Sequence, residues 1–178
     1  MDPLQRAVSC VTQAVLTNRG GYRPADEPHT LTFPEERISL RGESRLSLFV
    51  LQRYHLVHRP GDTDRGPWKV SVDAYSYSVD AADGREIFAY HWHPRESAIT
   101  LPHLHIGRGA GTLRDELDKT HFPTGRVALE DVLRLLIRDF SVAPLRSDWA
   151  TVLTQTQGRF EQYRTWPSSQ QQPSDPPF

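Results

Sequence analysis

The chain has 178 residues, which is enough to bury a hydrophobic core and predicts one domain. Its formal net charge of −1 excludes a global attraction to nucleic acid or to an anionic membrane, so any affinity for phosphate has to be local. Its single cysteine, Cys10, excludes an intramolecular disulfide and a thiolate-rich zinc site, and the lack of a long apolar run predicts a soluble, cytoplasmic protein without a membrane partner.

The N-terminal segment predicts a helix from about Pro3 to Thr17. Asp2 and Pro3 suit the start of a helix, and apolar residues recur at helical spacing up to Val15. The next segment, 21–34, contains three prolines and no clear periodicity. It is expected to be a loop or a poorly formed edge strand.

Residues 37–106 have the pattern of antiparallel strands. The segments 46–57, 68–79 and 85–93 are rich in β-branched and aromatic residues, and Asp83-Gly84 predicts a tight hairpin turn between the last two. We therefore expect a meander of long strands.

Alternation along this hairpin predicts which side chains share a face. Phe88, Tyr90 and Trp92 should lie on one face of the sheet, and His91 and His93 on the other. An even-length turn places small residues of the preceding strand beside the histidines; these are Ala74, Ser76 and Ser78. The histidines are then expected to face a cleft with a floor of small side chains.

The C-terminal half predicts two long helices. Gly107, Gly109 and Gly111 indicate a turn, without the Lys-Ser/Thr of a phosphate-binding loop, and 112–119 is expected to form a short helix. Two apolar stripes follow, separated by Pro144, and Ser147 is expected to cap the second helix. The stripes consist of Leu129, Val132, Leu133, Leu136 and Phe140, and of Trp149, Val152, Leu153, Phe160 and Tyr163.

Together these elements predict an α+β fold. The antiparallel meander should be covered on one face by the N-terminal helix and the two C-terminal helices. We expect a single domain over residues 1–165 and a disordered, Pro- and Gln-rich tail over 166–178.

Five of the eight histidines are concentrated in one part of the chain. Residues two apart in a strand face the same way, so two His-x-His pairs can bring four imidazoles together. Imidazole titrates near neutral pH, transfers protons and binds transition metals. The candidate catalytic residues are His91, His93, His103, His105 and His121; we expect His29, His55 and His58 to be structural or exposed.

The leading interpretation is cleavage or binding of RNA without a cofactor. Cleavage needs a base, an acid and a cation near the phosphoryl oxygens, which two imidazoles and an arginine can supply. Arg95, Arg108 and Arg126 are the candidate phosphate-binding residues. Which histidine would be the acid and which the base stays open.

A second interpretation is a metal-dependent enzyme that acts on a small molecule. Three imidazoles, or two with a carboxylate, form an open zinc or iron site. Its ligands would come from His91, His93, Glu96, His103 and His105. A third interpretation is a non-catalytic interaction protein in which the histidines are incidental.

Three short motifs resemble the TumE group of bacterial toxin–antitoxin proteins. They are Tyr90-His91-Trp92-His93, Pro102-His103-Leu104-His105 and Leu129-Glu130-Asp131-Val132, within about residues 36–140. The resemblance implies a bacterial cytoplasmic protein, directed at RNA and bound by a helix-turn-helix antitoxin. The chain departs from the family pattern by an additional helix at each end and a Gly-rich insertion.

Overall fold

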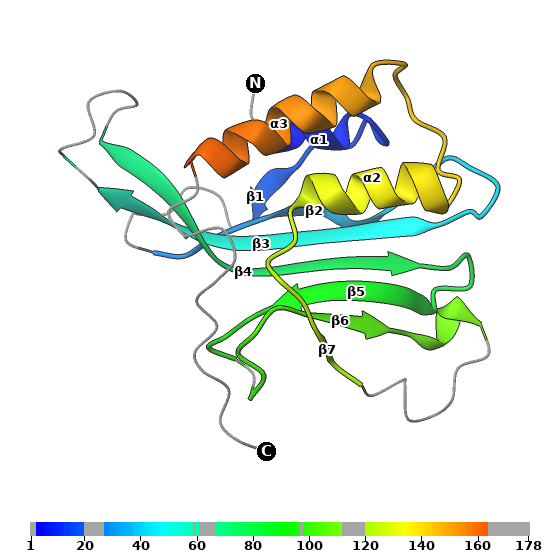
Figure 1. Ribbon diagram of the computed structural model, residues 1–178, viewed down its shortest axis with the longest axis horizontal. Helices are drawn as coiled ribbons and strands as arrows, with labels where there is room; N and C mark the ends of the chain where they lie inside the picture. The colour runs from blue at the N-terminus through cyan, green and yellow to red at the C-terminus, as the bar shows by residue number, and fades with distance from the viewer. Residues whose placement is uncertain are drawn as a thin grey trace.

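The computed structural model describes residues 3–19, 27–58, 60, 67–96, 98–111 and 120–163. Within them, helices and an antiparallel sheet form an α+β fold (Figure 1). The helices are α1 (Pro3–Val8), α2 (Leu129–Asp139) and α3 (Trp149–Tyr163), with a short 3-10 helix η1 (Arg108–Ala110). The strands are β1 (Thr17–Arg19), β2 (His29–Ser39), β3 (Ser47–His58), β4 (Trp68–Asp80), β5 (Glu86–Trp92), β6 (His103–Ile106) and β7 (Phe122–Pro123).

The seven strands form one sheet in sequential order, and every neighbouring pair is antiparallel. The predicted meander is therefore confirmed. The turn between β4 and β5 uses Gly84 at φ +80°, and Ala81 N–H donates to the Arg85 carbonyl at 2.9 Å. Glycine suits this turn because a side chain disfavours positive φ.

Strand β2 corrects the prediction of a loop or a poorly formed edge strand for residues 29–34, whereas residues 21–26 of that prediction lie outside the described part of the chain. The strand runs through Pro34 as far as Ser39, and its pairing with β3 is interrupted between Thr32 and Arg37. Proline has no N–H to donate, so it fits a strand only where the ladder is broken. Glu36, at φ 61°, lies in the same irregularity. This interruption is a β-bulge, and it accommodates Pro34, whose residue type had argued against a strand.

Helix α1 is shorter than predicted, because it ends at Val8 instead of Thr17. The Gln5 side chain forms hydrogen bonds with the segment that follows α1. Its Oε1 accepts from Leu16 N–H at 2.8 Å, and its Nε2 donates to the Ala14 carbonyl at 3.2 Å. Thr17 then enters β1 opposite Thr32. These long-range bonds override the helical spacing of the apolar residues.

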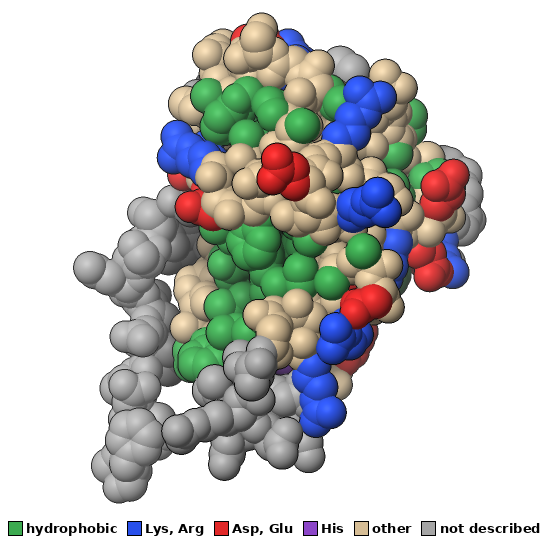
Figure 2. Space-filling view, turned by 90° about the vertical axis from the view of Figure 1, so that its right-hand side faces the viewer, with side chains coloured by type: hydrophobic (Ala, Val, Ile, Leu, Met, Phe, Trp, Pro, Cys, Tyr) green, Lys and Arg blue, Asp and Glu red, His purple; other side chains and the backbone are tan. Residues whose placement is uncertain are grey.

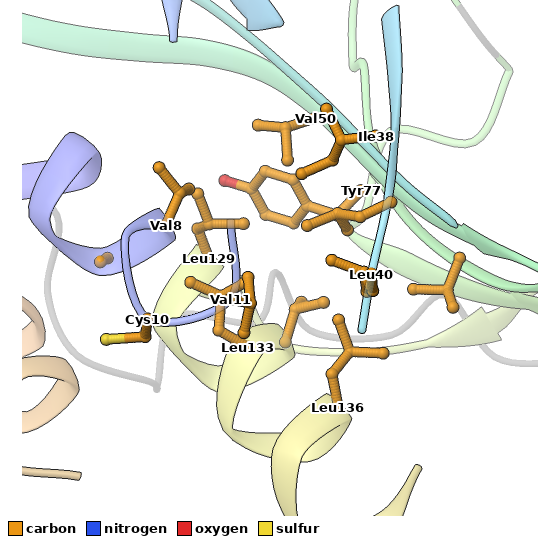
Figure 3. Close-up of a cluster of buried hydrophobic side chains, with 14 of the residues drawn as sticks. Val8, Cys10, Val11, Ile38, Leu40, Val50, Tyr77, Leu129, Leu133 and Leu136 are labelled. Carbon is orange, nitrogen blue, oxygen red and sulfur yellow. The ribbon is translucent and has the colours of Figure 1, made fainter. Parts of the chain in front are cut away.

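The core lies between the helices and one face of the sheet. The three helices gather on the same side of the strands in Figure 1. Figure 3 shows Val8 and Val11 beside the α2 residues Leu129 and Leu133, with Tyr77 of β4 above and to the right of them. All these side chains are 0–1% exposed, so the apolar stripe predicted for α2 faces the core.

Helix α3 also presents its predicted apolar residues Val152 and Leu153 to the core, and both are buried. It begins at Trp149, so Asp148, rather than the predicted cap Ser147, directly precedes its first turn. The predicted short helix over 112–119 and the predicted tail 166–178 lie outside the described residues.

One side of the molecule carries charges of both signs around an apolar band (Figure 2). The band crosses the middle of this view, below the helices, and almost no histidine is visible there. The mixture of blue and red side chains agrees with the net charge of −1. Within the described parts of the chain, none of the helices has the length and apolar character needed to cross a bilayer.

Candidate functional site

The site lies on the sheet face opposite the helices. Strand register places Ser76 directly opposite His91 and Ser78 opposite Ala89, as predicted from the hairpin. Tyr75, Tyr77 and Trp92 occupy the other face, where they are buried in the core. The small side chains of β4 therefore lie next to the histidines.

Strands β5, β6 and the segment before β7 bring together His91, His93, His103, His105 and His121, called the histidine cluster below. His91 and His103 are paired across β5 and β6, and His105 is paired with Ala89. Ring centroids of neighbouring members lie 4.3 to 5.8 Å apart. All five predicted residues thus meet in one place.

His103 is the most buried member, at 1% exposed. Its Nδ1 lies 2.8 Å from the Leu101 carbonyl oxygen. Because a carbonyl only accepts, Nδ1 must carry the proton, and the lone pair of the neutral ring is then on Nε2. Metal-binding histidines are commonly oriented by such a bond from their second nitrogen.

The cluster favours uncharged imidazoles. Burial, reinforced by the other four rings, lowers the pKa of His91 to about 4. Burial likewise lowers the pKa of His105 to about 4, with His121 as the next cause, and burial lowers the pKa of His103 despite its bond to Leu101. These three rings are therefore neutral at pH 7 and keep a lone pair available.

Two sets of three histidines have the spacing of metal ligands. In each set, one ring nitrogen per residue lies within 4.8 Å of the others. The first set is His91, His93 and His103, and the second is His103, His105 and His121. Three imidazoles around one ion leave a coordination position open, as in catalytic zinc sites.

Glu96, the candidate carboxylate ligand, belongs to neither set among the described residues. Its Oε1 instead forms an ion pair with Nη1 of Arg53, whose Nε lies 3.3 Å from Oδ1 of Asp73. Nε2 of His55 is 2.9 Å from Oδ2 of the same aspartate. This network satisfies the carboxylate. The sequence did not indicate it, because its residues come from β3, β4 and the turn after β5.

The three candidate phosphate-binding arginines occupy different places. Arg95 and Arg108 are exposed, in the turn after β5 and in η1. The guanidinium of Arg126 lies 3.3 Å from the centroid of the Trp92 ring, on the helix-bearing face. Burial lowers the pKa of Arg126 to about 10. Arg126 is thus separated from the histidines by the sheet.

Among the remaining histidines, His29 is buried and stacks on Tyr54 with centroids 5.1 Å apart. His58 is exposed and its ring lies 4.8 Å from that of Trp68. These positions agree with the structural or exposed roles expected for histidines outside the cluster.

Comparisons with protein-family models, curated proteins and solved structures return no match. The resemblance to the TumE group stays a prediction that rests on its three short motifs.

Proposed function

We propose that the histidine cluster is a transition-metal centre and that the protein is a metal-dependent enzyme acting on a small molecule. The observation that carries the proposal is the presence of two three-histidine sets with ring nitrogens within 4.8 Å. Bringing these partly buried imidazoles together costs solvation free energy, which a bound ligand would offset.

The chemistry of the ligands favours zinc. Imidazole suits zinc, copper, nickel and iron, whereas mononuclear iron oxygenases usually add a carboxylate. The nearby carboxylate of Glu96 is paired with Arg53, so the donors available to one ion are three imidazole nitrogens. Zinc held in this way lowers the pKa of a bound water to about 7, which supports hydrolysis at neutral pH.

Metal analysis of the full chain, purified without a histidine tag, tests this proposal. After incubation with Zn²⁺ and dialysis, we expect close to one ion per chain. His103→Ala should lose the ion, because His103 belongs to both sets. His58→Ala is the matched control and should retain it, since His58 lies outside the cluster. A wild-type chain that stays metal-free would contradict the proposal.

RNA cleavage without a cofactor is the second candidate function. It is supported by the pair His105 and His121, whose centroids are 4.3 Å apart and of which His121 is exposed, with the exposed Arg108 following β6. The proposal also includes the toxin role and the helix-turn-helix antitoxin that the TumE resemblance implies. Its weakness is the low pKa of His105, about 4, because a general acid works best with a pKa near the operating pH.

An RNA digest in the presence of EDTA separates the two functions. The metal-dependent enzyme should leave cellular RNA intact under these conditions. Cleavage that persists with EDTA and disappears in His105→Ala and His121→Ala would favour the ribonuclease. Growth arrest on expression in a bacterial host, relieved by the protein of an adjacent repressor-like gene, would support the toxin role.

A further inference from the structure

The two histidine sets share His103, and this restricts how they can bind metal ions. Nδ1 of His103 donates to the Leu101 carbonyl, which leaves one lone pair on the neutral ring. One lone pair binds one ion. Both sets therefore cannot be complete three-histidine sites at the same time, and one of them has to be the metal site.

The inner set, defined as His91, His93 and His103, has the better shielded ligands. None of its members is exposed, whereas the other set includes the exposed His121. Its three ring separations are nearly equal, at 5.6, 5.8 and 5.6 Å. The corresponding separations in the other set are 4.9, 5.1 and 4.3 Å.

His93 supplies an independent observation. Its Nδ1 is buried and has no hydrogen-bond partner among the described residues. A buried polar atom without a partner is uncommon in proteins and calls for a specific explanation, such as a missing ion. A metal ion bound by the inner set would account for this nitrogen, but an ion bound by the other set would not.

Resting on the proposed function, we infer that the inner set binds the metal ion. The outer pair, His105 and His121, then contacts the molecule that occupies the open coordination position. The His105 ring lies 4.9 Å from both His91 and His103, and His121 lies 5.1 Å from His103. Both rings are therefore next to the ion without being needed to hold it. They can donate hydrogen bonds to a bound water, hydroxide or small anion.

Cobalt(II) titration of the metal-free protein tests the assignment, because this ion reports its ligands in the visible spectrum. His91→Ala and His93→Ala should weaken cobalt binding by more than about 100-fold, which exceeds the usual effect of changing a group behind a ligand. His105→Ala, His121→Ala and the control His58→Ala should bind cobalt as the wild type does. Circular dichroism checks the fold, and His93→Gln replaces His93→Ala if the latter fails to fold.

Azide added to the cobalt-loaded protein tests the role of the outer pair. His105→Ala or His121→Ala should weaken azide binding at least about tenfold, as expected for a lost hydrogen bond to a charged ligand. Unchanged azide affinity would overturn that role. Loss of cobalt in His121→Ala with retention in His93→Ala would overturn the inner assignment alone. A wild-type protein that binds no cobalt or zinc would overturn the proposed function itself.

Discussion

The geometry of single side chains decides what the histidine cluster can do. The bond from His103 to the Leu101 carbonyl fixes one tautomer, and burial keeps His91 and His105 uncharged near neutral pH. A cluster of this kind is better suited to binding a cation than to supplying a protonated acid. This is the physical reason for preferring the metal-dependent function over cofactor-free RNA cleavage.

Ser76 offers a prediction at this scale. It lies opposite His91 on the same face of the sheet, so a larger side chain there would displace the imidazole. Ser76→Leu should lower zinc affinity by roughly 10–100-fold, the range seen when groups behind metal ligands are disturbed. Competition with a chromophoric chelator measures this affinity.

Ser71→Leu is the matched control, because Ser71 is on the same strand but opposite His55, outside the cluster. Its zinc affinity should equal that of the wild type. Equal affinities in Ser71→Leu and Ser76→Leu would show that the β4 side chains do not support the site.

At the scale of secondary-structure elements, the turn after β6 holds the histidine strands together. Gly107 N–H donates to the Ile87 carbonyl at 2.9 Å, and a Cβ at Gly107 would lie 2.2 Å from the Glu86 carbonyl oxygen. The chain approaches β5 so closely that only glycine fits without a backbone shift. The glycines that the sequence suggested as a flexible turn therefore have a packing role.

Gly107→Ala should consequently lower the free energy of unfolding by about 1–3 kcal/mol, since overpacking forces the backbone to move. Gly158→Ala is the control: it lies within α3 and has no atom within 4 Å of an added Cβ. That substitution should stabilise the protein by about 0.5–1 kcal/mol through helix propensity. Urea unfolding of both variants measures the difference, and an unchanged midpoint for Gly107→Ala would contradict the argument.

Local sequence signals were enough to predict the elements that depend mainly on residues close to one another in the sequence. The Asp83-Gly84 turn and the alternation of side chains predicted the pairing of Ser76 with His91, but the structure reaches this register through a β-bulge between Val79 and Asp80 that the predicted even-length turn did not include. The apolar stripe of α2 was sufficient to predict this helix and the face that it buries. In contrast, the early end of α1 depends on long-range bonds from Gln5, and β2 depends on a bulge that accommodates Pro34.

For the candidate site, spacing predicted which histidines meet but not how their nitrogens are used. The Leu101 carbonyl that orients His103 belongs to the backbone, so the type of residue at this position does not reveal the contact. The pairing of Glu96 with Arg53 joins residues that are 43 positions apart. Arg126 was suggested by its closeness to His121 in sequence, yet the two residues belong to opposite faces of the sheet, because Arg126 packs on Trp92.

On the scale of the whole molecule, one face of the sheet carries the hydrophobic core and the other carries the site. Substitutions among the helices should therefore change stability more than metal affinity. Glu130 of α2, at 2% exposed, lies on the core side of the molecule, and burial raises the pKa of its carboxyl. The two faces thus contribute opposite pH dependences to folding.

The metal-free protein should become less stable as pH falls from about 6.5 to about 4. In this range the unfolded chain protonates histidines with ordinary pKa values, whereas folded His91 and His105, with pKa values of about 4, stay neutral. The unfolded state binds more protons there, so acid favours it. Glu130 acts in the opposite direction, because its raised pKa favours the protonated folded state as pH falls.

Thermal unfolding of the chelator-treated protein at several pH values measures this dependence. His91→Gln with His105→Gln should flatten the curve between pH 6.5 and 4, since two of the responsible groups are removed. His58→Ala should keep the wild-type slope. An equally steep curve in the double variant would show that these two rings are not its source.

Sequential strand order has a consequence for how such a site is inherited. Every strand pairs with the next one along the chain, so all candidate ligands fall within the continuous segment 91–121. A single stretch of the gene therefore encodes the complete ligand set. Recombination could transfer that stretch to another antiparallel sheet as one unit, without reassembling the ligands from distant parts of the chain.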